Sequence, residues 1–253
     1  MLDRRLLATA LVLTLSASLG SAAIIIADLT DPDDSYTIAE VIAAKGIQVG
    51  DKLFDEFVVT PSGTATAVSP GADAIVVTGN QTLPGDYGLR FNGGWGAGGG
   101  QEADTTIKFR VSIIEPFLSQ GWVIEDNELW ITAKGVSQTL NGGIVSISED
   151  VYLTDPADGP VDPIANKHVF YATPTDQKLS DHAYFMQGGQ PVVATEIWVV
   201  KDVYVSGGLG ETGVAHLSEF YQSFSQVPEP ATAVVLLVGG AGLLFSRHRR
   251  RRR

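Results

Sequence analysis

Histidine, serine and cysteine most often carry acid–base and nucleophilic catalysis, and this sequence shows no recognisable arrangement of them. His168, His182 and His216 stand apart, without the His-x-His or His-Glu-x-x-His spacing that binds zinc. The chain has no cysteine and no Gly-x-Ser-x-Gly nucleophile turn. We therefore predict no catalytic residue and a protein that is not an enzyme. A secreted hydrolase acting on polysaccharides or esters is the alternative.

Acidic side chains could still act in pairs, because glycoside hydrolysis uses two carboxylates whose separation is set by the fold. Glu125, Asp126 and Glu128 crowd one short segment. Such a group is more typical of a solvated turn than of a catalytic pair. Glu196, on a predicted strand, has no partner that the sequence identifies.

Two groups of aspartates could supply the oxygen ligands that calcium takes, of which it needs about six to eight. One group follows the expected mature N-terminus and the other lines a loop rich in proline and glycine: Asp28, Asp31, Asp33 and Asp34, and Asp155, Asp158 and Asp162. Neither has the residue order of an EF-hand loop. Calcium is thus the one cofactor we consider, with solvated turns as the alternative. A calcium-dependent adhesion module is the weaker functional hypothesis that follows.

A glycine tract spans 92–100 and carries one tryptophan, Trp95. No Lys-Ser or Lys-Thr pair follows the tract, and the next segment has the pattern of a strand, so a phosphate-binding loop is excluded. We predict a flexible hairpin loop with Trp95 at its tip. The indole could stack on a sugar ring, or it could fold back onto the core.

The elements that would hold these residues are β-strands. In the segment 104–113 the apolar residues Ile107, Phe109, Val111 and Ile113 alternate with polar ones, which predicts a half-buried antiparallel strand. The segment 195–205 alternates likewise, with Lys201 interrupting its apolar face. Shorter strands, separated by turn-forming residues, are predicted over 53–60, 74–78, 87–91, 129–133, 144–148, 168–172, 183–186 and 216–224.

Many short strands with turns between them indicate an all-β protein, an antiparallel and jelly-roll-like β-sandwich forming one domain over 24–226. One short helix is predicted over 38–45, closed by Gly46. The segments 148–153 and 200–205 resemble each other weakly. They could be equivalent strands of a duplicated sheet, or two ordinary strands of similar composition.

The body of the chain is strongly acidic. Residues 24–226 contain 27 acidic and 9 basic side chains, a net charge of −18. Such a surface repels nucleic acid and anionic lipid, and it attracts cations and basic partners. Because disulfides are excluded, an exported body must be held together by core burial, alone or with bound metal ions.

The first residues have the pattern of a secretory signal peptide over 1–23. A basic start at Arg4 and Arg5 precedes the apolar run 6–19, and small residues end at Ala23, where we place the cut by signal peptidase. The run is short for a membrane span, so a retained anchor is the lesser alternative.

The last residues have three consecutive parts. Pro228, Glu229 and Pro230 come first and favour an extended, accessible peptide. The uncharged segment 231–245 follows, about 22 Å long as a helix and therefore a marginal membrane span. A basic cluster that would stay in the cytoplasm closes the chain: Arg247, Arg249, Arg250, Arg251, Arg252 and Arg253.

This order over 227–253 resembles the PEP-CTERM sorting signal of bacteria with Gram-negative-type envelopes. The resemblance implies that an exosortase in the inner membrane recognises the tail and cuts it near Glu229. It also implies delivery to the cell envelope or release into extracellular polysaccharide. A permanent anchor with a coincidental Pro-Glu-Pro is the alternative. We expect an exported surface or matrix protein whose body has a structural or carbohydrate-binding role.

Overall fold

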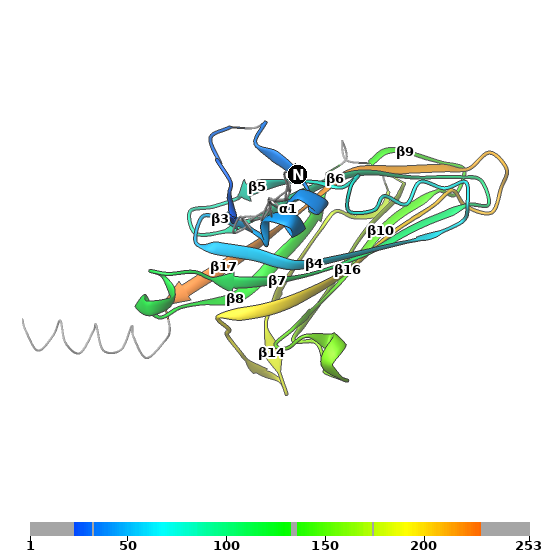
Figure 1. Ribbon diagram of the computed structural model, residues 1–253. Coiled ribbons are helices and arrows are strands. Elements are labelled where there is room, and N and C mark those ends of the chain that lie inside the picture. Colours follow the sequence, from blue (N-terminus) through cyan, green and yellow to red (C-terminus); the bar gives the residue numbers. More distant parts are fainter. Residues whose placement is uncertain (1–22, 32, 133–135, 174, 229–253) are drawn as a thin grey trace, which may run out of the picture.

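The computed structural model describes residues 23–31, 33–132, 136–173 and 175–228, which fold into two large β-sheets and one short helix (Figure 1). The first sheet has eight strands, in the spatial order β1 (Ile25–Ile26), β3 (Ile47–Val49), β4 (Lys52–Gly63), β7 (Glu102–Ile113), β16 (Glu196–Ser206), β10 (Ile144–Tyr152), β11 (Ala165–Thr173) and β12 (Asp176–Lys178). The second sheet has the order β13 (Ser180–Tyr184), β8 (Trp122–Ile131), β17 (Val214–Pro228), β6 (Tyr87–Gly98), β5 (Val76–Gln81) and β2 (Ser35–Thr37), with β9 (Val136–Leu140) also paired to β17.

Shorter elements complete the chain. β14 (Met186–Gln187) and β15 (Gln190–Pro191) form a separate hairpin at the bottom of the view in Figure 1. Two single 3₁₀ turns cover Leu118–Gln120 and Pro156–Asp158. Among the described strands every pair is antiparallel except β1 with β3, which is parallel.

The predicted alternation is confirmed in the central strands. In β7 the side chains of Ile107, Phe109 and Val111 are fully buried, and the residues between them are partly exposed. β16 pairs with β7 and repeats the pattern. The buried faces of the two sheets meet in one hydrophobic cluster, so the expected two-sheet antiparallel architecture is confirmed. The sheets hold more strands than the eight of a simple jelly roll.

Phenylalanine rings fill the middle of the core. Phe91 of β6 stacks on Phe220 of β17 at 4.8 Å between ring centroids, and Phe109 lies 5.9 Å from Phe91 across the two sheets. Such ring pairs add about 0.5–1.5 kcal/mol each to the effect of burial. This contact fixes β6, β7 and β17 against one another.

The helix α1 (Ile38–Ala44) begins where the sequence predicted and ends one residue earlier. Thr37 caps its N-terminus, and Glu40 returns a hydrogen bond to the cap in a complete capping box. Lys45 adopts a left-handed conformation with φ 64°, so the backbone turns away before Gly46. The buried side chains of Ile38 and Val41 join the helix to the core.

The glycine tract is a strand and not the flexible loop that we predicted. β6 continues through the tract to Gly98 and pairs with β17 along most of its length. Gly93 leaves room for the indole of Trp95, since a Cβ on Gly93 would lie 2.7 Å from that ring. Backbone pairing, which does not depend on side-chain pattern, therefore extends the strand where the sequence shows no alternation.

Among the described residues no helix is long and apolar enough to cross a membrane. The predicted signal peptide lies outside these residues except for Ala23, and so does the whole predicted membrane segment 231–245.

Candidate functional site

The tail joins the body at the end of a central strand. β17 lies between β8 and β6 in the second sheet and runs to Pro228, where Val227 pairs with Val123 and Pro228 pairs with Trp122. The extended conformation predicted for 227–230 is therefore found at Val227 and Pro228, the two described residues of that segment, and Pro228 is exposed. Glu229, Pro230 and the six arginines from Arg247 to Arg253 lie outside the described residues.

The outer face of the second sheet carries a row of large side chains, which we call the aromatic row: Arg90, Tyr221 and Trp130. These residues are direct neighbours on β6, β17 and β8. The rings of Trp130 and Tyr221 are stacked, with centroids 5.3 Å apart and planes inclined by 9°. Tyr184 of the next strand, β13, is 61% exposed. The row and Tyr184 place flat apolar surface and hydrogen-bonding groups on one outer face.

Polar groups border the aromatic row. The hydroxyl of Tyr221 donates to Glu219 at 3.0 Å. Burial and this hydrogen bond raise the pKa of Tyr221. His182 lies 3.3 Å from Asp126 and touches the ring of Tyr184 edge-on. The border therefore offers carboxylate and imidazole groups beside the aromatic rings.

The outer face of the first sheet is occupied by ion pairs. Lys108 lies 4.8 Å from the ring of Trp198 and holds both carboxylate oxygens of Asp155 at 2.8 Å. Arg110 binds Asp55 through two hydrogen bonds of 2.8 and 2.7 Å. These bonds raise the pKa of Arg110 above its ordinary value. Burial alone would raise the pKa of Asp155, but hydrogen bonds from Lys108 and a backbone N–H lower it overall. Trp198 is thus covered by paired cations.

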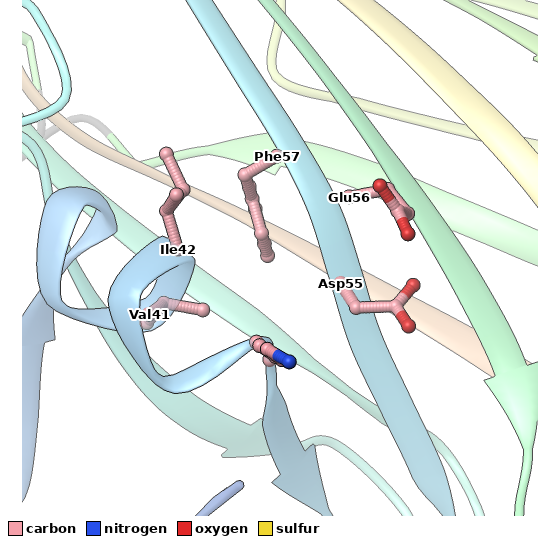
Figure 2. A pocket seen from close by; sticks show the side chains of 7 residues that line it. Val41, Ile42, Asp55, Glu56 and Phe57 are labelled. Carbon is pink, nitrogen blue, oxygen red and sulfur yellow. The ribbon is translucent and has the colours of Figure 1, made fainter. Parts of the chain in front are cut away.

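A hollow of about 420 Å³ lies beside α1 and β4. Figure 2 shows Ile42 and Phe57 between helix and strand, with the carboxylates of Asp55 and Glu56 on the other side of β4 in this view. Glu56 has φ 53° and sits in a β-bulge, where the pairing with β7 shifts. Strained backbone of this kind persists only where the surrounding structure holds it. Since Asp55 is already bound by Arg110, Glu56 is the exposed carboxylate at the hollow.

The predicted calcium ligands are not brought together. Among the described residues no group of three or more acidic or histidine side chains could hold a metal ion. In the first group Asp28 accepts hydrogen bonds from Thr30, and Asp34 accepts one from the backbone N–H of Asp28. Asp31 accepts from the backbone N–H of Asp33. These are local turn contacts, as the solvated-turn alternative expected.

The second group is equally dispersed. Asp155 is paired with Lys108 and also caps a 3₁₀ turn through the N–H of Ala157. Asp158 ends that turn, and Asp162 lines a separate hollow near Met186. Neither group of aspartates is therefore assembled into a calcium site among the described residues.

Trp95 is fully buried, so the suggestion that it stacks on a sugar is wrong and the core alternative is confirmed. Its indole N–H donates to the hydroxyl of Thr105 at 3.0 Å, and its ring lies 5.6 Å from Phe220. The strand places Trp95 on the inner face, where a large ring fills the space between the sheets.

One contact that the sequence did not reveal joins a serine to a histidine. Ser146 Oγ lies 2.8 Å from His168 Nε2 on neighbouring strands of the first sheet. The nearby acid, Asp181, accepts from the backbone N–H of His168 and pairs with Lys178 at 2.6 Å. Asp181 therefore does not orient the imidazole as the acid of a catalytic triad would. Ser146 and His168 meet only because their two strands pair in this register. No sequence motif could have predicted this contact.

Residues 226–253 match the family described as the PEP-CTERM protein-sorting motif. The chain therefore carries this sorting motif, as the tripartite tail indicated. A comparison with curated proteins gives no match.

Three solved structures resemble part of the chain. The first is CBM27-1 of Caldicellulosiruptor saccharolyticus in complex with mannohexaose, with 12% identity, 68% of this chain and 98% of that chain covered, and a TM-score of 0.34. The second is TmCBM27, a carbohydrate-binding module described for specific mannan recognition, with 13% identity, the same coverage and a TM-score of 0.24. The third is the arabinose-bound α-L-arabinofuranosidase MgGH51, with 8% identity, 81% of this chain and 30% of that chain covered, and a TM-score of 0.24. TM-scores this low carry no argument about ligand or activity.

Proposed function

We propose that this chain is an exported protein of the cell envelope or extracellular matrix, whose tail is recognised and cut by an exosortase. The observation that carries the proposal is the match of residues 226–253 to the PEP-CTERM protein-sorting motif. In this proposal the segment 1–23 is removed by signal peptidase, and 231–245 is a temporary membrane handle held by the terminal arginines. The exposed end of β17 at Pro228 supports access of a protease to the motif that follows.

The test is mass spectrometry of the protein purified from cells and from medium of its native host. The expected mature species begins after Ala23 and ends near Glu229, without the arginines. Glu229→Ala should accumulate a longer, membrane-bound form, while Glu219→Ala, a matched change inside β17, should be processed normally. If the only mature species retains the terminal arginines, the tail is a permanent anchor and the proposal fails.

For the body we propose a structural or carbohydrate-binding role, with the aromatic row as the binding surface. The C–H groups of a sugar ring pack against aromatic faces, and its hydroxyls need neighbouring donors and acceptors. The stacked pair of Trp130 and Tyr221 offers the first, and Arg90 and Glu219 offer the second. Trp198 is the counterpart on the first sheet, but Lys108 and Arg110 lie over its ring.

Electrophoresis of the mature protein through gels containing polysaccharide from the host matrix tests this role. The wild-type protein should be retarded, and Trp130→Ala should weaken the retardation about tenfold, as expected for loss of an aromatic anchor. Trp198→Ala is the matched control and should bind normally. Equal retardation of both variants would exclude the aromatic row. Unretarded migration of the wild-type protein would exclude the carbohydrate-binding role and leave the structural role.

A secreted esterase is the second candidate, favoured only by the contact between Ser146 and His168. Hydrolysis of short-chain esters by the mature protein, abolished in Ser146→Ala, would support it. Activity unchanged in that variant would remove this pair from consideration.

A further inference from the structure

Three charged residues lie side by side on the inner, apolar face of the first sheet. Lys167 of β11 is directly opposite Glu149 of β10, and Glu149 is directly opposite Lys201 of β16. The side chains of all three are fully buried. Asn127 of β8, in the second sheet, is also fully buried and faces them across the core. We call these four residues the buried cluster.

The contacts within the buried cluster join an amine, an amide and a carboxyl group. Lys167 Nζ donates a hydrogen bond to Asn127 Oδ1 and lies 2.8 Å from Glu149 Oε1. The same oxygen, Glu149 Oε1, accepts from Asn127 Nδ2 at 2.7 Å. One carboxyl oxygen therefore touches both the amine nitrogen and the amide nitrogen. The amine in turn lies beside the carbonyl group of that amide.

Lys201 holds the other side of the carboxyl group. Its ammonium contacts Glu149 Oε2, and the rings of Phe91, Phe109 and Phe220 surround it at 5.7 to 6.0 Å. The aromatic rings exclude water, and their faces attract a cation. We therefore place the charge of the cluster on Lys201, paired with Glu149.

The electrostatics of the cluster favour one neutral amine. A single carboxylate can balance only one ammonium, and a second buried charge would be costly. Burial lowers the pKa of both lysines, that of Lys201 well below its ordinary value and that of Lys167 to about 7, so the contacts decide which amine is neutral. Lys201 is held by the carboxylate and the aromatic faces, whereas Lys167 also contacts the amide of Asn127. A neutral amine has a free electron pair, so Lys167 is a nucleophile held against an amide.

We propose that Lys167 and Asn127 condense without any other enzyme to form an intramolecular amide bond, with Glu149 as the catalytic proton carrier. Lys167 Nζ attacks Asn127 Cγ and forms a C–N bond. Glu149 Oε1 takes one proton from Nζ and delivers it to Nδ2. The C–Nδ2 bond then breaks and one molecule of ammonia leaves. Atoms and charges balance without an oxidant or cofactor.

The bond would connect the two sheets, since β11 belongs to the first and β8 to the second. A sequence without cysteine has no disulfide for this purpose. The described part of the core contains another buried lysine with a different set of contacts. Lys52 is also buried and lies 3.2 Å from an amide oxygen, that of Gln226, but its acid partner Asp51 contacts the amine and not the amide. Lys52 therefore serves as the control for Lys167, because it is a buried lysine beside an amide that we do not expect to form a bond.

The test is mass spectrometry of the purified full chain after cleavage before aspartate residues. Such cleavage separates the peptide 126–149, with Asn127, from the peptide 162–175, with Lys167. The expected product is one linked species, lighter than the two peptides together by one ammonia. Fragmentation should place the link on Asn127 and Lys167. Two separate peptides of unchanged mass in the wild-type protein would overturn the proposal.

Variants identify the role of each group. Asn127→Ala and Lys167→Met remove a reacting partner and should give separate peptides. Glu149→Gln keeps the size of the side chain but cannot carry the proton, so linking should be lost while circular dichroism still shows a folded β-protein. Linked peptides in Glu149→Gln would overturn the role of Glu149. Lys52→Met removes the comparison lysine and should leave the wild-type link intact. If Glu149→Gln does not fold, the peptide masses in the wild-type digest still show whether the amide bond forms.

Discussion

Lys201 is a residue whose place in the sequence pattern already indicates a buried charged site in the core. It interrupts the apolar face of its strand in the sequence, and the structure places its side chain in the core beside Glu149. The two residues also occupy the same position in the weakly similar segments 148–153 and 200–205, which are neighbouring antiparallel strands. A charged residue on the apolar face of a predicted strand therefore predicts a buried partner of opposite charge. The partner's identity comes only from register.

On the outer face of the first sheet, the negative charge of Asp202 lowers the stability of the protein at neutral pH. Burial and a hydrogen bond with Asp104 raise the pKa of Asp202 from 3.8 to about 6. The folded protein holds this proton more tightly than the unfolded chain, so the contribution to stability is lost as pH rises through about 6. Asp202→Asn cannot ionise. Neighbouring groups remove part of the hydration of Asp202, but the residue is still exposed to solvent and its charge is screened, so we expect the variant to be only about 1 kcal/mol more stable than the wild type at neutral pH.

Urea unfolding at about pH 4 and about pH 7 measures this effect, because the gain should be present at the higher pH and absent at the lower. An equal gain at both pH values would show that ionisation of Asp202 is not its cause.

Lys167 gives a prediction of opposite sign. Its pKa falls from 10.5 to about 7 on folding, so the unfolded chain binds more protons between these values and stability rises with pH across them. In Asn127→Ala the amine stays free and should show this rise. In the linked wild type the nitrogen belongs to an amide and does not titrate. The free energy of unfolding, measured from about pH 7 to pH 9, should therefore rise more steeply in the variant. Identical slopes would indicate a free Lys167 in both proteins.

At the scale of elements, a glycine near the start of β6 lets two central strands approach closely. A Cβ on Gly88 would lie 1.7 Å from the carbonyl oxygen of Gln222 on β17. Gly88→Ala should push the two strands apart and destabilise the protein by about 3 kcal/mol, measured by urea unfolding. Gly210→Ala is the matched control, since open space surrounds that position. Similar stability of both variants would mean that β6 and β17 adjust freely.

The same elements show what sequence patterns can and cannot predict. β7 and β16 were predictable because their two faces differ in polarity at most positions, with Thr105 and Lys201 as exceptions on the inner face. The end of β6 was not, because glycines carry no side chains that could alternate, and Trp95 was therefore assigned to a loop. The aromatic row was missed for another reason. Arg90, Tyr221 and Trp130 are far apart in the chain and meet only through pairing between strands. The sorting motif was predictable because it is contiguous.

At the scale of the whole molecule, the two sheets must stay together once the tail is removed, if the proposed cleavage takes place. The hydrophobic core between them supplies most of the stability, as in any sandwich. The proposed bond would add a constraint on the unfolded chain. β8 and β11 would remain tied through 127–167 even when every non-covalent contact is lost.

The size of that constraint follows from the entropy of the closed loop. A cross-link spanning about 40 residues removes chain entropy worth about 4 kcal/mol from the unfolded state. For a chain of this length, such a gain raises the thermal midpoint by about 10 °C. We expect the thermal midpoint of the wild type to exceed that of Glu149→Gln by at least this amount in calorimetry.

A raised midpoint alone would not identify the bond, because the variant also loses its ion pairs. The dependence of unfolding free energy on denaturant separates the two causes, since a tied unfolded chain exposes less surface and gives a smaller slope. A wild-type slope equal to that of the variant would mean that the unfolded chains are equally free and that the sheets are joined by packing alone.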